Sequence, residues 1–480
     1  MATAPNATDS LDDLAAALAG PLLRPDDAGY DDARAVWNGM IDRYPAAIAR
    51  CQGKADVMDA VDAARAAGLP ATVRGGGHNV AGTAVADDAL VIDCSEMTAV
   101  AVDPEERIVR VQGGATWADV DRATQQHGLA TPGGVVSDTG VAGLTLGGGI
   151  GHLRCKHGLS CDNLRSVELV TGAGDHITAS EDEHPELFWA IRGGGGAPGV
   201  VTEFAFDCHP VGPEVATCLA FYDAADIETI LAGYREWVAA SPDEASTLTF
   251  SGTMPDEELF DAEDLETEKI AIMGCYAGNP EDGERVLAPL RGLDSGTSEL
   301  IAEGVEPIAE SVEPIADFSG AMPYAEFQQL FDEDYPDGLR YYWKSLYLDG
   351  LSDTAIDRIA YWADVAPSPL STVDVWELGG AIEGVDPEES AFPGRHAPFL
   401  LGVEANWEDS DADDANVAWV RDCLDDMRQF SGGGTYLNFP GFFEDEGEMV
   451  ETTFGPEAER LAAVGERYDP DGIFGSFTGR

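Results

Sequence analysis

The spacing of apolar residues divides the chain of 480 residues into four parts. At the start, apolar positions recur at helical spacing from Leu11 to Leu23, which predicts a helical lead-in. Short apolar runs with glycine-rich turns follow, then longer apolar runs separated by acidic segments, and finally aromatic and glycine loops. The predicted parts are a helical lead-in at 1–42, a glycine-rich domain at 43–213, a second domain at 214–430 and a C-terminal segment at 431–480.

Within the glycine-rich domain, strand-like and helix-like patterns alternate. Runs of β-branched and other apolar residues favour strands, and apolar residues three or four apart favour helices. Thr116 suits the N-cap of the middle helix, and Gly128 suits its C-terminal end. Strands are predicted at 70–75, 89–94, 107–114 and 164–171, and helices at 54–68, 116–128 and 184–193.

The second domain has longer apolar runs that alternate with acidic helices. This pattern is typical of an antiparallel sheet covered by helices on one face. The predicted fold class is therefore α+β. The strands of the second domain are predicted at 216–222, 269–276, 372–382 and 399–407, and a last helix is predicted at 455–470 in the C-terminal segment.

Acidic residues outnumber basic ones by 89 to 27, which gives a net charge of −62, and only four of the basic residues are lysine. The acids are spread along the chain and interleaved with apolar residues, so they do not form a disordered acidic tail. The composition resembles that of cytoplasmic proteins from salt-accumulating halophiles. The same negative field disfavours nucleic acid and anionic membranes as partners.

Missing signals narrow the class of protein further. The N-terminal residues lack the basic start of a secretory signal, and no stretch reaches the roughly 20 apolar residues of a membrane span. Eight cysteines without a CxxC pair do not make a disulfide framework in a chain of this length. We therefore expect a cytoplasmic protein that does not contact membranes, and the sequence leaves its oligomeric state open.

Three glycine-rich loops stand out: RGGGHN at 74–79, TGVAGLTLGGGIG at 139–151 and RGGGGAPGVV at 192–201. Glycine adopts backbone conformations closed to other residues and lets N–H groups approach a ligand closely, as pyrophosphate binding requires. None of the loops forms the G-x-G-x-x-G turn of a Rossmann fold, and no Gly-Lys-Ser/Thr of a P-loop occurs. The loops therefore predict a nucleotide site of another kind.

Longer motifs resemble a known family. GLPATVRGGGHNVAG, the segment from HGLATPGG to VELVTGAG, and ELFWAIRGGGG resemble the FAD-linked oxidases with the vanillyl-alcohol-oxidase (PCMH) type of FAD domain. TYLNFPG and RLAAVGERYDPDGIF are similar to the berberine-bridge-enzyme-like members. The resemblance spans residues 40–475. It implies FAD as cofactor, a two-subdomain PCMH-type FAD-binding domain at 43–213, a substrate-binding domain at 214–430 and a C-terminal segment that returns to the FAD domain.

The resemblance also implies roles for residues. In that family the histidine after the glycines is bonded to the 8α-methyl group of the flavin, which implies a covalent bond at His78. Some members form a second bond through a cysteine, but Val136 stands at that place, so we expect a single bond. Tyr436 is the implied catalytic base. The residues expected to bind FAD are Arg74, Gly75, Gly76, Gly77, His78, Asn79, Thr139, Gly140, Gly143, Gly147, Gly149, Gly151, Val201 and Asn438.

Other residues keep two interpretations. Tyr436 could instead be a buried structural tyrosine, and Glu377 and Glu404 are reserve candidates for the base. In the aromatic stretch 339–350, Tyr342 and Lys344 share one face of a predicted strand. That face is either ordinary alternation of core and surface, or an aromatic wall and a cation in the substrate cavity.

A cluster of soft ligands raises the possibility of zinc. Its spacing, H-x2-C-x-H-x3-C, matches no common zinc module, so we expect no metal site. Two departures from the family pattern, Ala197-Pro198 and the ending FGSFTGR, bear on packing at the adenine side. The clustered residues are His152, Cys155, His157 and Cys161.

The favoured function is that of an FAD-dependent oxidase. A substrate C–OH or C–N carbon gives a hydride to the flavin, Tyr436 takes the proton, and O₂ accepts the electrons to form H₂O₂. In related enzymes valine at the place of Thr139 leaves room for O₂, whereas leucine obstructs it, so Thr139 favours an oxidase. A dehydrogenase with another electron acceptor and a non-enzymatic flavin-binding protein are the alternatives. A sugar, an aromatic alcohol and an amine all remain open as the small-molecule substrate.

The net charge of −62 predicts a stability that depends on salt. At molar salt the Debye length falls to about 3 Å, so repulsion between surface carboxylates is screened. Removing the salt should loosen the fold, and the melting temperature should fall continuously from molar to tens of millimolar KCl. A melting temperature that stays constant over this range would contradict the halophile interpretation.

Overall fold

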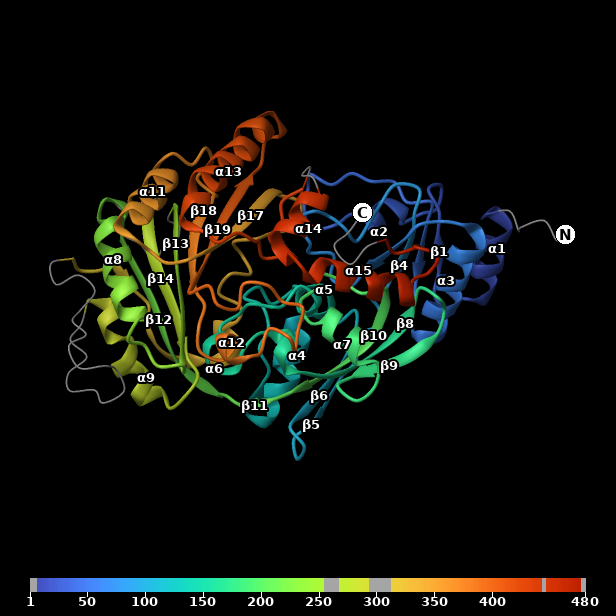
Figure 1. Ribbon diagram of the computed structural model, residues 1–480, viewed down its shortest axis with the longest axis horizontal. Coiled ribbons are helices and arrows are strands. Elements are labelled where there is room, and N and C mark those ends of the chain that lie inside the picture. Colours follow the sequence, from blue (N-terminus) through green and yellow to red (C-terminus); the bar gives the residue numbers. More distant parts are fainter. Residues whose placement is uncertain (1–6, 254–266, 293–311, 443–445, 476–480) are drawn as a thin grey trace.

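The computed structural model describes residues 7–253, 267–292, 312–442 and 446–475. Figure 1 shows two halves side by side: the glycine-rich domain in blue to green, and the second domain in yellow-green to orange. The first six residues of the predicted lead-in and the last five of the C-terminal segment lie outside the described residues. Within the described residues, no helix is long and apolar enough to cross a lipid bilayer.

The lead-in is only partly helical. After α1 (Ala7–Ala17), residues Leu22–Leu23 form β1, which pairs with β2 (Ala47–Arg50). The prediction of a helix as far as Leu23 is therefore wrong, because Gly20 brings the chain directly onto the sheet. A Cβ atom on Gly20 would lie 1.9 Å from the carbonyl oxygen of Arg50, so only glycine fits this contact.

The first sheet of the glycine-rich domain is mixed. Its additional elements are α2 (Tyr30–Arg34), α3 (Lys54–Ala67), β3 (Ala71–Arg74) and β4 (Leu90–Asp93). The strand order is β1-β2-β4-β3, with β2 and β3 both parallel to β4. Parallel strands need a crossover connection, and α3 supplies it with its apolar face buried. The strands predicted at 70–75 and 89–94 and the helix at 54–68 are thus confirmed.

The second sheet of this domain is antiparallel, in the order β5-β6-β10-β8-β9. Its strands are β5 (Val100–Asp103), β6 (Ile108–Gln112), β8 (Leu164–Thr171), β9 (His176–Ser180) and β10 (Gly199–Asp207). A separate short pair joins β7 (Leu129–Ala130) to β11 (His209–Pro210). The helices of this part are α4 (Trp117–Thr124), α5 (Val141–Leu146), α6 (Arg154–His157) and α7 (Pro185–Ile191).

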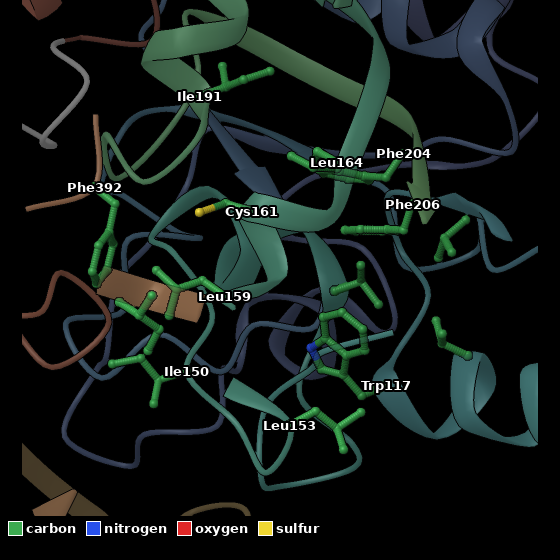
Figure 2. Close-up of a cluster of buried hydrophobic side chains, with 14 of the residues drawn as sticks. Trp117, Ile150, Leu153, Leu159, Cys161, Leu164, Ile191, Phe204, Phe206 and Phe392 are labelled. Atoms are coloured by element: carbon green, nitrogen blue, oxygen red, sulfur yellow. The ribbon is translucent and has the colours of Figure 1, made fainter. Parts of the chain in front are cut away.

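The start of α4 shows how local sequence fixes the core here. Thr116 and Asp119 form the capping box of this helix, and Gly128 follows its final turn in the left-handed conformation, as predicted. The cap directs Trp117 inward, where it is fully buried. Figure 2 shows it in a cluster that also contains Phe392, which the second domain contributes. One hydrophobic cluster therefore spans both domains.

The second domain is built on one large antiparallel sheet, which confirms the predicted fold class. The strand order is β15-β12-β14-β13-β18-β19-β17, and β16 also pairs with β12. The strands are β12 (Glu214–Asp223), β13 (Ala245–Thr253), β14 (Glu268–Tyr276), β15 (Ala316–Asp317), β16 (Gly320–Pro323), β17 (Arg340–Leu348), β18 (Thr372–Glu377) and β19 (Phe399–Trp407).

Four helices cover the outer face of this sheet, on the side away from the glycine-rich domain in Figure 1. They are α8 (Ile227–Val238), α9 (Pro280–Leu287), α11 (Asp353–Asp364) and α13 (Asp413–Met427). Two short helices, α10 (Tyr324–Phe327) and α12 (Ala381–Gly384), belong to the connections. Strand alternation sends Val373 and Val375 toward the helices, and Asp374 and Trp376 toward the opposite, inner face.

The C-terminal segment leads from the sheet back to the glycine-rich domain. Pro440 forms a bridge with Lys344 of β17, and two helices, α14 (Glu446–Phe454) and α15 (Glu457–Tyr468), follow. Arg460 on α15 pairs with Glu186 on α7 (3.0 Å) and lies over the ring of Trp189. Residues 435–441 therefore lie at the junction of both domains.

Candidate active site

The first two glycine loops touch through their backbones. The loop at 74–79 follows β3, and the loop at 139–151 begins just before α5. A Cβ atom on Gly76 would lie 2.5 Å from the backbone nitrogen of Gly140, and one on Gly140 would lie 2.4 Å from that of Gly76. A side chain at either place would push the loops apart, so glycine is required at both.

These loops line one side of a cavity of about 250 Å³, here called the central cavity, whose other side is the inner face of the sheet. A second cavity of about 990 Å³ continues past Gly113 and Val201 and shares Asn79 and Leu146 with the first. A Cβ atom on Gly143 would meet no atom within 4 Å. Bare backbone therefore faces open space along an elongated site, as a dinucleotide such as FAD requires.

His78 enters the central cavity from the first loop. Its Nε2 atom lies 3.4 Å from Oδ1 of Asp138, and 13% of its side chain is exposed. The indole of Trp37 stacks on the imidazole with ring centres 5.3 Å apart, and Trp37 itself stacks on Tyr341 at 3.7 Å. The ring is held in one plane, and its Nδ1 atom is the nitrogen that does not face Asp138.

Tyr436 lines the same cavity from the C-terminal segment. Its hydroxyl oxygen accepts hydrogen bonds from the backbone nitrogen of Ile150 (3.0 Å) and from Nδ2 of Asn438 (2.8 Å). Asn438 also donates to the carbonyl of Leu144 (3.1 Å). Burial raises the pKa of Tyr436 to about 12, and these two donors act in the opposite direction. The phenol is therefore neutral at pH 7, and its phenolate form increases as the pH rises.

The inner face of the sheet brings two buried carboxyl groups to the cavity. Glu404 on β19 and Asp374 on β18 are 2% and 3% exposed, and both line the central cavity. Tyr335 donates a hydrogen bond to Oε2 of Glu404 (3.0 Å). Burial raises the pKa of Glu404 well above its usual range, and the neighbouring Asp374 adds to this effect. Burial also raises the pKa of Asp374 above its usual range.

Glu377, the other reserve candidate for the base, lies on the opposite face of β18. Its carboxylate accepts hydrogen bonds from the hydroxyl of Ser241 (3.0 Å) and from the backbone nitrogen (3.1 Å) and hydroxyl (2.5 Å) of Thr247. It does not line the central cavity. Of the two reserve candidates, the structure therefore brings only Glu404 to the site.

Most of the residues expected to bind FAD line one of the two cavities. The exceptions have packing contacts instead. Nη1 of Arg74 donates to the carbonyls of Ala33 and Ala35 (2.5 and 2.8 Å). Cβ atoms on three loop glycines would lie 2.2 Å or less from neighbouring atoms, so these glycines let the loop pack closely. The lining residues are Gly75, Gly76, Gly77, His78, Asn79, Thr139, Gly140, Gly143, Val201 and Asn438; the packed glycines are Gly147, Gly149 and Gly151.

The aromatic stretch on β17 corrects one hypothesis. Trp343 lines the central cavity, whereas Tyr342 and Lys344, on the other face of the strand, do not. Tyr342 packs on Phe442 (ring centres 5.1 Å apart) and accepts a hydrogen bond from Arg421 (3.1 Å). The idea of a lysine cation in the substrate cavity is therefore wrong, because strand alternation turns only the odd-numbered residues inward.

The residues considered for zinc have other surroundings. His152 packs on Phe327 (ring centres 4.4 Å apart), and His157 stacks on His209 at 3.9 Å. Cys155 and Cys161 are buried free thiols. Among the residues that the structure describes, no group of three or more His, Cys, Asp or Glu side chains is placed to hold a metal ion.

Comparison with known proteins identifies the family. Residues 45–180 match the family model of an FAD binding domain. An uncharacterised FAD-linked oxidoreductase of Bacillus subtilis, YgaK, is 30% identical, and the alignment covers 95% of this chain and 96% of that protein. The chain belongs to the FAD-linked oxidoreductases.

Two further members of this family have more specific names. The crystal structure of 6-hydroxy-D-nicotine oxidase from Arthrobacter nicotinovorans is 26% identical and superposes with a TM-score of 0.82, covering 95% of this chain and 96% of that one. A xylooligosaccharide oxidase of Thermothelomyces thermophilus is 27% identical over 91% of this chain and 87% of its own. Residues 45–180 thus belong to an FAD-binding domain, the fold matches PCMH-type FAD-binding oxidases, and this FAD-linked oxidoreductase is an FAD-dependent enzyme.

Several residues of the site were not predicted from the sequence, and Trp37, Tyr335 and Asp374 are among them. Alternation along TVDVWE could have grouped Asp374 with Trp376 on one face and the two valines on the other, but not shown which face lines the cavity. Trp37 and Tyr335 belong to connecting segments. No periodic pattern of apolar residues predicts the position of Trp37 or Tyr335, because packing between distant segments brings them to the cavity.

Proposed function

We propose that the protein is an oxidase that removes a hydride from a C–OH or C–N carbon of a small substrate and holds its FAD covalently at His78. The observation that carries the proposal is the central cavity, which His78 and Tyr436 both line. When bound, FAD accepts the hydride and passes the electrons to O₂, giving H₂O₂. The protein's own part is to orient the substrate, exclude water and manage a proton.

Covalent attachment at His78 is supported by the orientation of its ring. Asp138 faces Nε2, and an N–H at that position leaves the lone pair on Nδ1 free to form a bond. Trp37 limits rotation of the imidazole. Val136, which stands where a second attachment residue is found in some relatives, lines the same cavity but has no nucleophile. We therefore propose a single covalent bond.

Tyr436 is the proposed proton acceptor. Its hydroxyl lies at the junction of the loops and the sheet, and two N–H donors to its oxygen stabilise the phenolate. Thr139, also in the lining of the cavity, has nearly the shape of valine and leaves room for O₂. We further propose that the protein works in a salt-rich cytoplasm, on the basis of its net charge of −62.

The first test of the proposed function is an anaerobic photometric titration at molar salt, preceded by a peroxide-release screen over sugars, alcohols and amines. Bleaching of the flavin by a substrate, followed by rapid recolouring in air, is the expected result. Bleaching with slow recolouring would indicate a dehydrogenase. A flavin that none of the screened compounds bleaches would indicate a flavin-binding protein without this chemistry.

For the covalent bond, we expect the flavin of the wild type to remain in the pellet after acid precipitation, whereas His78→Ala releases all of its FAD into the supernatant. The Asp138→Asn variant should attach flavin more slowly, because it lacks the carboxylate that faces Nε2 of His78 and favours a proton on that nitrogen. Absorbance of both fractions is the measurement. Soluble flavin in the wild-type supernatant would refute the covalent assignment.

For Tyr436, we expect Tyr436→Phe to slow flavin reduction by roughly 10²–10⁴-fold while the visible spectrum stays nearly unchanged. Because the pKa of Tyr436 is raised to about 12, its basic form grows about tenfold for each pH unit below that value. Wild-type reduction should therefore accelerate between pH 7 and 10, and the variant should lose this dependence. Stopped-flow reduction at the wild-type rate in the variant would move the role of base to Glu404.

For oxygen, we expect Thr139→Leu to slow reoxidation of the reduced enzyme by roughly tenfold or more, a barrier change of about 1.4 kcal/mol, and to leave reduction by substrate nearly unchanged. Thr139→Val is the matched control, since it keeps nearly the same shape and replaces the hydroxyl by a methyl group. Mixing reduced enzyme with aerated buffer gives the rate. Equal reoxidation in both variants would show that Thr139 does not control access of O₂.

A further inference from the structure

The sheet side of the central cavity presents a pair of carboxyl groups to the substrate space. Asp374 and Glu404 both lie over Gly402, whose Cβ, if present, would be 3.7 Å from Oδ2 of Asp374 and 3.7 Å from Oε1 of Glu404. Oε2 of Glu404 accepts a hydrogen bond from Tyr335. Oδ1 of Asp374 is buried and has no hydrogen-bond partner among the described atoms. The wall of the cavity therefore presents one acceptor, Oδ1 of Asp374, and one donor, the indole nitrogen of Trp376, that make no hydrogen bond among the described atoms.

The charge of this pair is not balanced by the protein groups around the cavity. Two buried carboxyl groups this close share a proton, because ionising both would place like charges side by side at low dielectric. When the pair of Asp374 and Glu404 has lost one of its two protons, it carries one negative charge in the wall of the cavity. Among the described residues that line the cavity, only His78 has a basic side chain, and it already faces Asp138 on the loop side.

The rest of this wall is apolar and aromatic. It is formed by Leu248, Phe250, Phe331, Trp343, Trp376 and Leu400. A sugar ring carries hydroxyl groups on several sides, and each buried hydroxyl needs a hydrogen-bond partner. Among the described residues on the sheet side, those partners are the two carboxyl groups, Tyr335 and the indole nitrogen of Trp376. Aromatic faces, in contrast, attract organic cations.

We propose that the substrate is a small amine with an apolar or aromatic group, bound as its ammonium ion by Asp374 and Glu404. The inference rests on the proposed function, because it takes the central cavity as the place of oxidation. The two carboxyl groups supply the charge that a cation needs, and the aromatic wall receives its apolar part. The unpartnered Oδ1 of Asp374 accepts an N–H hydrogen bond from the ammonium group.

The reaction balances without a further reactant. The ammonium ion gives one proton to Tyr436, which is the base of the proposed function, and a hydride leaves the carbon next to nitrogen as the C=N bond forms. The hydride and the proton reach O₂ as H₂O₂. One ammonium ion and one O₂ thus give one iminium ion and one H₂O₂, with two electrons transferred from carbon to oxygen.

A probe that cannot be oxidised tests charge recognition directly. Benzyltrimethylammonium is a permanent cation whose nitrogen has no lone pair to expel a hydride, and benzyl alcohol is a neutral compound with the same ring. Binding of each to the FAD-containing protein is measured in molar KCl by the change in the flavin spectrum. We expect Glu404→Gln and Asp374→Asn each to weaken binding of the cation by roughly tenfold or more, and to change binding of benzyl alcohol less than about twofold.

Glu377→Gln is the matched control. Glu377 is also a buried carboxyl group, on the same strand as Asp374, but it faces the helices, so its variant should bind the cation like the wild type. If the two cavity variants fail to fold, the wild-type protein still tests the inference. It is expected to bind benzyltrimethylammonium more tightly than benzyl alcohol. Preference for benzyl alcohol, or equal loss of cation binding in all three variants, would overturn the inference.

The peroxide-release screen separates failure of this inference from failure of the proposed function. Peroxide from amines but not from sugars or alcohols supports both. Peroxide from sugars or alcohols alone overturns the amine assignment and leaves the oxidase intact. Without peroxide from any compound the oxidase proposal fails, and tight binding of benzyltrimethylammonium that depends on Glu404 would still support a cation site.

Discussion

Gly76 and Gly140 touch through their backbones, and no side chain fits between them. This contact holds the loop that follows β3 against the loop that precedes α5, although the two are far apart in the sequence. It brings His78 and Thr139 to the same cavity. If the loops separated, the anchor for the cofactor and the residue proposed to control oxygen access would no longer share a site. The contact between these two loops therefore requires that neither position carries a side chain.

The second domain completes the site through strand alternation. One face of its sheet is sealed by helices, and Glu377 belongs to that side. The other face remains for the cavity, and it carries Asp374, Trp376 and Glu404. Because successive residues of a strand point to opposite faces, a shift of one residue in β18 would exchange the carboxyl group in the cavity for a valine. The register of this sheet thus determines the chemistry offered to the substrate.

Local signals in the sequence predicted much of the fold. The N-cap at Thr116, the strand at 164–171 and the α+β class follow from patterns in the sequence, and all are confirmed. The helix expected to reach Leu23 was wrong, since the backbone contact of Gly20 with Arg50 is a tertiary effect. The domain boundaries stay a prediction.

Site residues that belong to long sequence motifs were predictable. His78 in RGGGHN and Tyr436 in TYLNFPG are examples, and both line the cavity. The site was not predictable where packing between distant segments decides. Trp37 reaches His78 from the lead-in, and Glu404 could not be preferred over Glu377 until the faces of the sheet were known. A pattern of two-residue period shows that a strand has two faces, but not which one the helices cover.

A crystal structure of the purified FAD-containing protein tests the central claim most directly. The account predicts a flavin ring in the central cavity, between the loops joined at Gly76 and Gly140 and the sheet face that carries Asp374 and Glu404. Electron density should run without a break from the ring to Nδ1 of His78. A flavin ring outside this cavity, or density that ends short of His78, would contradict the account.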